Sequence, residues 1–220
     1  MSRYYDFFCP VKLMAGEQAL EQLAGELAGL GARRPLLLTD KGVSSTGLAI
    51  LLANVLAEGE LPVADIWDEI PADSSTAVVE RIAARYRELE CDSLVALGGG
   101  SVIDTAKAVN ILASMGGDRL LDYAGAGCLT RPLQPLAVVP TTAGTGSEVT
   151  LVAVIKDEAS GRKVPFTSPF LLPQLAVLDP RLTQGLPLNI TAATAMDAMT
   201  HAIEAFIGNA KNPVSDALAL

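Results

Sequence analysis

The stretch SLVALGGGSVIDTAK, residues 93–107, gives the strongest signal for the fold. A short apolar run predicts a buried strand, three glycines follow it, and a helical pattern continues from Ser101. Ser101 and Asp104 stand at the spacing of a capping box, so we expect them to satisfy the first turn of that helix. A strand that enters a helix through glycines is typical of α/β proteins with parallel strands.

The three glycines have two interpretations. Gly98, Gly99 and Gly100 lack a Cβ atom, so a pyrophosphate could approach bare backbone N–H groups at a helix N-terminus. A tight turn that needs glycine only for packing is the alternative. The run matches neither GxGxxG nor the P-loop, so those fingerprints do not identify a ligand.

The same alternation of strand and helix extends in both directions. Upstream, residues 35–40 and 62–68 predict strands, and residues 46–59 and 74–89 predict helices. Downstream, residues 136–139, 151–157, 161–166 and 173–179 predict short strands. Helical patterns return from Pro187 and Pro213. We therefore expect an α/β domain over residues 1–184 and the start of a helical domain over residues 185–220.

The composition excludes several classes of function. The apolar runs are far shorter than the roughly 20 residues that span a bilayer, and a net charge of -9 argues against nucleic acid as a partner. Asp6 and Pro10 interrupt the region where a signal peptide would be apolar, so we expect a cytoplasmic protein. Cys9, Cys91 and Cys128 are far apart, which favours reduced and mostly buried thiols.

Asp40 ends the predicted strand at 35–40. A carboxylate there could accept hydrogen bonds from both ribose hydroxyls of an adenosine and repel a 2′-phosphate, favouring NAD over NADP. In the usual dinucleotide fold the acidic residue follows the glycine loop by about 20 residues, whereas Asp40 precedes it. Considered alone, a turn or a helix cap before Lys41 is the simpler interpretation.

The segment PTTAGTGSE, residues 140–148, has the composition of a loop that lines a polar ligand. Its four hydroxyl side chains, from Thr141, Thr142, Thr145 and Ser147, could both donate and accept hydrogen bonds. An ordinary surface loop explains the same composition equally well.

DAMTHAIEAF, residues 197–206, contains the only histidine of the chain. Asp197 and His201 are four residues apart in a helical pattern, so their side chains point from one face and could share a metal ion. A catalytic metal normally keeps at least three protein ligands, so an Asp–His hydrogen bond is the simpler interpretation. Glu204 is either a further ligand or a solvent-facing residue.

Four motifs, GGGSVIDTAK, PTTAGTGSEVT, LDPRL and AMDAMTHAIEAF, occur together in the order and spacing of the iron-containing alcohol dehydrogenase family. The chain resembles that family over its whole length. The resemblance implies a Rossmann-like nucleotide-binding domain of the dehydroquinate synthase-like fold, an all-helical domain after it, and an active site between them. It also implies NAD(P)-dependent interconversion of small alcohols and aldehydes, and a dimer.

The resemblance further implies the roles of individual residues. Gly99, Gly100 and Ser101 would bind the pyrophosphate, and Asp40 would meet the adenosine ribose. The other cofactor contacts would come from Gly98, Asp104, Thr141, Thr142, Thr145, Ser147, Val152, Val154, Lys163 and Leu182. Asp197 and His201 would bind the metal, Fe²⁺ in the first place and Zn²⁺ as the alternative.

The chain departs from the family at the metal site. That site uses one Asp and three His, and the two remaining histidines lie in the helical domain, beyond Leu220. Since loss of a supporting partner alone costs about 10- to 100-fold, we expect the chain by itself to bind metal weakly and turn over poorly. It could be a fragment lacking most of the helical domain, a catalytically silent nucleotide-binding or assembly protein, or a subunit completed by another. A glycerol or maleylacetate reductase-type relative is the alternative enzyme.

Overall fold

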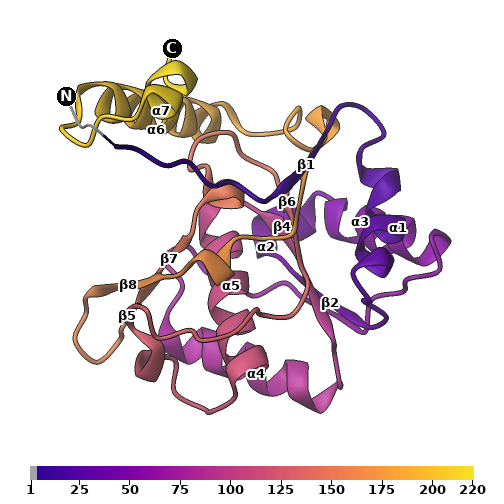
Figure 1. Cartoon of the computed structure of the whole chain (residues 1–220). Helices are drawn as coiled ribbons and strands as arrows, with labels where there is room; N and C mark the ends of the chain where they lie inside the picture. Colours follow the sequence, from indigo (N-terminus) through magenta and orange to yellow (C-terminus); the bar gives the residue numbers. More distant parts are fainter. Residues whose placement is uncertain (1–3) are drawn as a thin grey trace.

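Six parallel strands form the main sheet, in the order β1-β9-β6-β4-β2-β3 (Figure 1). The computed structural model describes residues 4–220. The strands are β1 (Lys12–Ala15), β2 (Pro35–Leu38), β3 (Asp65–Trp67), β4 (Ser93–Gly98), β6 (Leu136–Pro140) and β9 (Leu175–Leu178). Every residue of β2, β4 and β6 is buried, as expected for a parallel sheet that is covered on both faces.

Two helix layers cover the sheet. Helices α1 (Leu23–Gly29) and α3 (Leu48–Glu58) pack on one face, and α4 (Thr76–Glu88) and α5 (Gly100–Met115) pack on the other. Within β2, Leu36 and Leu38 join the cluster under α4 and α5, whereas Leu37 joins the cluster under α1 and α3. This alternation follows from the two-residue period of a strand.

A smaller sheet lies beside α5. Its order is β5-β8-β7, where β5 is Gly125–Ala126, β7 is Val152–Lys156 and β8 is Lys163–Thr167. Strands β7 and β8 form an antiparallel hairpin. The connections include α2 (Lys41–Ser45) and the 3₁₀ helices η1 (Leu20–Gln22), η2 (Leu120–Tyr123), η3 (Ser147–Val149), η4 (Pro169–Leu171) and η5 (Pro180–Leu182).

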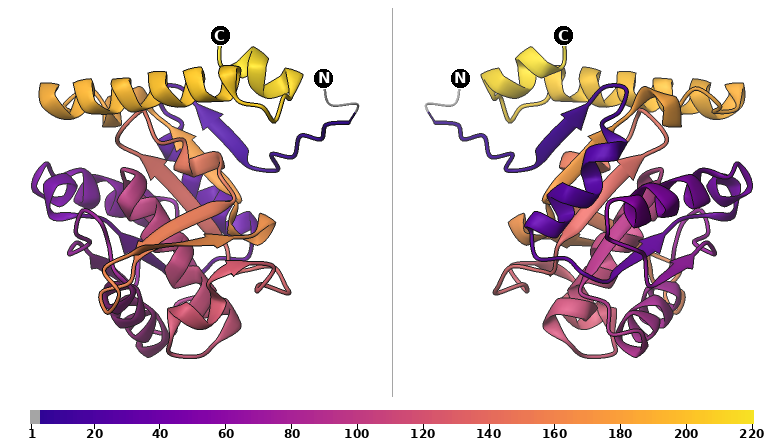
Figure 2. Two further views of the ribbon diagram at one scale, coloured as in Figure 1. Left: turned by 90° about the vertical axis from the view of Figure 1, so that its left-hand side faces the viewer. Right: turned by 90° about the vertical axis from the view of Figure 1, so that its right-hand side faces the viewer.

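The chain finishes in α6 (Leu188–Ile207) and α7 (Pro213–Leu218), which lie across one end of the α/β unit (Figure 2). No residue of α6 is buried, so the α/β unit covers this helix only lightly. Helix α7 begins at the predicted proline, with Asn212 as its cap: Val214 N donates to Asn212 Oδ1 at 3.0 Å. Among the helices of residues 4–220, none is long and apolar enough to cross a membrane.

The predicted α/β class is confirmed, with differences in detail. The strand expected at residues 62–68 is only three residues long, and β1 and α2 were not expected. The predicted capping box is wrong. Helix α5 starts at Gly100 with Gly99 as its N-cap, so Ser101 lies inside the first turn and cannot cap it. The expected burial of the three thiols is also corrected, because each is only half-buried, although all three are free as expected.

Candidate active site

The candidate site lies where the topology of the main sheet changes direction. After β2 the chain continues outward to β3, whereas after β4 it continues the other way to β6. Strands β2 and β4 are neighbours, and the hydroxyl of Thr39 donates to the carbonyl of Leu97 at 2.8 Å. Ligands of open α/β sheets bind in the crevice at such a point. Asp40 and the glycine turn therefore flank it, although they are far apart in sequence.

The glycine turn packs directly against the threonine-rich loop. A Cβ atom added to Gly100 would lie 2.8 Å from Thr145 Cγ2, and one added to Gly99 would lie 3.2 Å from Thr142 Oγ1. No other residue type fits here without displacing these side chains. The first N–H groups of α5, which have no partner within a helix, thus stay accessible from the carboxyl edge of the sheet.

The threonine-rich loop, residues 140–148, contacts both the glycine turn and α6. At one end, Thr141 N donates to the Gly98 carbonyl at 3.1 Å, and Thr141 is buried. At the other end, a Cβ atom on Gly144 would lie 2.6 Å from the Thr194 carbonyl of α6. Glycine at position 144 therefore permits the backbone of α6 to approach the loop this closely.

Helix α6 carries the candidate metal ligands. Asp197 Oδ1 and His201 Nε2 are 3.7 Å apart, and both side chains are about half exposed. Glu204 is exposed and does not join them: residues 4–220 contain no group of three or more His, Cys, Asp or Glu side chains able to hold one metal ion. One carboxylate and one imidazole fit part of a metal site.

A cleft of about 420 Å³ brings these parts together. Its lining residues include nine that the sequence predicted, namely Gly100, Ser101, Asp104, Thr145, Ser147, Val154, Lys163, Asp197 and His201. The remaining two, Asp73 and Ser74, were not predicted. The glycine turn and the Asp–His pair of α6 thus face one common space.

Seven predicted cofactor residues are not among those that line this cleft, namely Asp40, Gly98, Gly99, Thr141, Thr142, Val152 and Leu182. Two of them have other contacts. Asp40 caps α2, because Val43 N donates to Asp40 Oδ1 at 2.9 Å, which agrees with the simpler interpretation of this residue. Leu182 is buried in the hydrophobic cluster that contains Leu37 and Val139. Their contacts with a cofactor remain predictions.

The two unpredicted lining residues come from the loop between β3 and α4. Lys163 Nζ lies 2.6 Å from Asp73 Oδ1, and this hydrogen bond holds the pKa of the Asp73 carboxyl below its usual value. Ser74 Oγ is buried without a hydrogen-bond partner among the described residues, which fits a place for a polar ligand. The signal that sequence reasoning missed is the polar run DSS, residues 73–75, a few residues after the strand predicted at residues 62–68.

Helix α5 also hydrogen-bonds to strand β7, which lines the cleft with Val154. Val154 N of β7 donates to Asp104 Oδ2 at 3.0 Å. Lys107, which has no exposed surface, donates from Nζ to the carbonyls of Thr150 and Val152 at 2.7 and 3.0 Å and to the Thr150 hydroxyl at 3.0 Å. Asp104 thus has a structural contact in place of the predicted cap. Sequence reasoning missed Lys107 because a lysine among apolar residues gave no sign of its partners.

Burial is the largest cause of the pKa shifts of Asp104 and Lys107. It raises the pKa of Asp104 and lowers the pKa of Lys107 to about 8, although the charges of Asp104 and Glu148 oppose the shift of Lys107. A lysine whose pKa is lower when folded binds fewer protons than in the unfolded chain. The free energy of unfolding should therefore rise with pH above about 8.

We expect Lys107 to contribute an increase of about 1 kcal/mol between about pH 8 and 9, measured by urea unfolding at constant ionic strength as the difference from Lys107→Met. The Cys91 thiol, whose pKa burial raises to about 11, acts in the opposite direction as the pH rises through the ordinary thiol range, and the difference between the two proteins removes its effect. Lys107→Met should abolish the increase. An equal rise of the free energy of unfolding in that variant would show that other groups cause it.

Comparison with known proteins gives a consistent answer. The model of the family described as "Iron-containing alcohol dehydrogenase" matches residues 10–180. The chain is 48% identical to a 4-hydroxybutyrate dehydrogenase of Cupriavidus necator over 206 residues, 92% of this chain and 53% of that protein. It is 39% identical to an NAD-dependent methanol dehydrogenase of Bacillus methanolicus over 98% of this chain and 56% of that protein.

The solved structures agree. A crystal structure of 1,3-propanediol oxidoreductase superposes with a TM-score of 0.94 at 38% identity, covering 99% of this chain and 56% of that one. The chain thus spans about half the length of the relatives it matches. With the matching family model and these similarities over nearly all of its residues, the chain belongs to the iron-containing alcohol dehydrogenase family.

Proposed function

We propose that this chain supplies the NAD-binding part and two metal ligands of an NAD- and metal-dependent alcohol dehydrogenase. The observation that carries the proposal is the shared cleft, in which Asp197 and His201 face the glycine turn at Gly100 and Ser101. Residues 1–184 would form the nucleotide-binding domain and residues 185–220 the beginning of a helical, metal-binding domain. The named relatives act on small alcohols or their aldehydes, so we infer a substrate of that class.

The residues of the crevice fit a dinucleotide. The bare turn at Gly99 and Gly100 would bind the pyrophosphate through the N–H groups that begin α5. Asp40, at the neighbouring strand end, would accept hydrogen bonds from the adenosine ribose and disfavour NADP. The unpartnered hydroxyl of Ser74 and the exposed pair Asp73–Lys163 would face the other end of the ligand.

Asp197 and His201 would hold Fe²⁺, or Zn²⁺ as the alternative, since carboxylate and imidazole suit both ions. Further ligands would have to come from outside the described residues. When bound, the metal would supply positive charge that favours the ionised alcohol, and NAD would supply the hydride acceptor. The chain's own residues would orient these groups. Helix α5 begins at the glycine turn and hydrogen-bonds to β7, and α6 brings Asp197 and His201 to the same cleft.

Titration of the chain with NAD, NADP and Zn²⁺ tests the proposal. We expect NAD to bind at least about tenfold more tightly than NADP, and Zn²⁺ to bind weakly because only two donors are present. His201→Ala should lower the Zn²⁺ affinity by a further factor of about ten and leave NAD affinity within about twofold, with Glu204→Gln as the matched control. A chain that binds neither nucleotide would contradict the proposal.

A second function calls for the same experiment because residues 4–220 bring no more than two potential metal ligands together at one place. A catalytically silent nucleotide-binding or assembly protein would bind NAD and show no metal-dependent oxidation of any alcohol. A glycerol or maleylacetate reductase-type relative is the alternative enzyme, and the Asp–His pair argues against its metal-free members. We further propose a dimer, for which the edge strand β1 offers unpaired backbone groups.

A further inference from the structure

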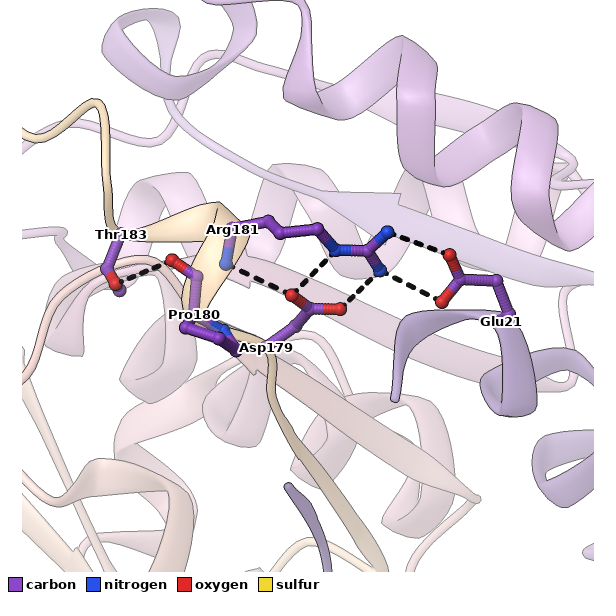
Figure 3. Close-up of polar contacts among 5 residues, drawn as sticks. All are labelled: Glu21, Asp179, Pro180, Arg181 and Thr183. Carbon is purple, nitrogen blue, oxygen red and sulfur yellow. Dashed lines mark hydrogen bonds and ion pairs between the residues drawn. The ribbon is translucent and has the colours of Figure 1, made fainter. Parts of the chain in front are cut away.

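The motif LDPRL, residues 178–182, forms an ion-pair cluster that the proposed function does not use (Figure 3). Arg181 donates from Nε to Asp179 Oδ1 at 2.9 Å and from Nη2 to Asp179 Oδ2 at 2.5 Å. It also donates from Nη1 and Nη2 to the two carboxylate oxygens of Glu21, both at 2.9 Å. The guanidinium thus makes bidentate contacts with two carboxylates, the geometry that lysine cannot reproduce.

The cluster is partly buried and electrostatically tight. The side chain of Asp179 has no exposed surface, whereas Arg181 and Glu21 are each 42% exposed. Hydrogen bonds from Arg181 are the main cause that lowers the pKa of both carboxyls, and the same bonds raise the pKa of Arg181. All three groups therefore stay charged at neutral pH. Removal of Arg181 would leave a buried carboxylate without its counter-charge.

The cluster joins two neighbouring parts of the carboxyl edge of the sheet. Asp179 follows β9 directly, and Glu21 lies in η1, which follows β1. Strands β1 and β9 are paired in register, and Gly16 N extends the pairing by donating to the Leu178 carbonyl at 3.1 Å. The ends of both strands are consequently fixed with respect to each other.

Helix α6 starts only a few residues beyond this cluster. Arg181 lies in η5, Leu182 is buried, and the Thr183 hydroxyl donates to the Pro180 carbonyl at 3.1 Å. Residues 183–187 then lead into α6. Since α6 buries none of its own residues, its place depends on this connection, on the close approach at Gly144, and on α7, where Asn212 Nδ2 donates to the Asp6 carbonyl at 2.8 Å.

We propose that Arg181 is a positioning residue: its contacts with Asp179 and Glu21 fix the base of the connection to α6 and so hold Asp197 and His201 over the cleft. The importance of this position for the reaction rests on the proposed function. The position of α6 itself does not, and it can be tested in the chain without any ligand.

Amide hydrogen exchange of residues 188–207 in Arg181→Ala tests the positioning role. A helix without tertiary support is marginal in water, so we expect exchange in α6 to become about tenfold faster, while β4 and β6 exchange as in the unmodified chain. Arg85→Ala is the matched control: Arg85 is 35% exposed and also bridges two carboxylates, Asp65 and Glu88, away from α6. Unchanged exchange in α6, or equal acceleration throughout the chain, would overturn the inference.

Glu21→Gln provides a second variant if Arg181→Ala does not fold. It removes one carboxylate and keeps the buried contact with Asp179, so we expect the same local acceleration in α6, reduced to about threefold. Exchange in α6 identical to that of the unmodified chain would count against the inference.

The ring protons of His201, the only histidine of the chain, connect the inference to the proposed function. We expect added NAD to shift their NMR signals in the unmodified chain and in Arg85→Ala. In Arg181→Ala the shift should be lost, with NAD affinity changed by less than about twofold. A full shift in Arg181→Ala would refute the positioning role. Absence of any NAD response in the unmodified chain would instead count against the proposed function, and the exchange result would still decide the role of Arg181.

Discussion

Replacement of Gly100 by alanine should reduce the affinity of the chain for NAD by about 10- to 100-fold. The new Cβ atom would lie 2.8 Å from Thr145 Cγ2, so Thr145, whose side chain lines the cleft, must shift. The shift would change the shape of the proposed pyrophosphate site. Overpacking of this kind costs about 1–3 kcal/mol, which corresponds to the stated loss because about 1.4 kcal/mol is tenfold in affinity.

Isothermal titration with NAD measures this effect, and Gly25→Ala is its control. Gly25 lies in α1, and a Cβ atom there would meet no atom within 4 Å, so NAD affinity should stay within about twofold. Unfolding curves of both variants would show whether the fold is retained. Unaltered NAD affinity in a folded Gly100→Ala chain would mean that the dinucleotide does not lie on this turn.

Replacement of Lys107 by methionine should lower the free energy of unfolding by about 3 kcal/mol. The change leaves the Thr150 and Val152 carbonyls without the ammonium that binds them, and each unsatisfied buried polar group costs about 1–3 kcal/mol. It also removes the nearest positive charge from the buried Asp104. Methionine also avoids the cost of burying a charged group, which offsets part of this effect. The expected total therefore lies near the lower end of the range for two unsatisfied carbonyls.

Urea unfolding at about pH 7 gives the size of the effect, with Lys41→Met as the control. Lys41 is 73% exposed and makes only a surface ion pair with Glu69, so its replacement should change the stability by less than about 0.5 kcal/mol. Equal small effects of the two substitutions would show that the contacts of Lys107 with the β7 segment contribute little.

The sequence predicted most of the fold because the fold depends on periodicity. The apolar runs that became β2, β4, β6 and β9 are buried strands, and the helical patterns before and after them became α3, α4, α5 and α6. The elements that were missed are short or exposed. Strand β1 has four residues and no apolar alternation, and α2 exists largely because Asp40 caps it.

The candidate site was predictable only in part, because its members come from separate elements. Motif order indicated the glycine turn, the threonine-rich loop and the Asp–His pair, and the structure brings residues from all three to one cleft. The loop at Asp73 and Ser74 carries no motif. The contacts of Asp104 and Lys107 were hidden as well, since they depend on which strand lies beside α5. Local spacing cannot reveal such a neighbour.

Asp40 has two roles, and both affect any redesign of cofactor preference. Its carboxylate caps α2 and, in the proposed function, also selects against NADP. A change to alanine would relieve the repulsion of a 2′-phosphate but would remove the cap, which is worth about 1 kcal/mol. Asparagine keeps an oxygen in place for the Val43 amide while it abolishes the negative charge. Asp40→Asn is therefore the substitution expected to admit a phosphorylated coenzyme while it preserves the thermal stability of the chain.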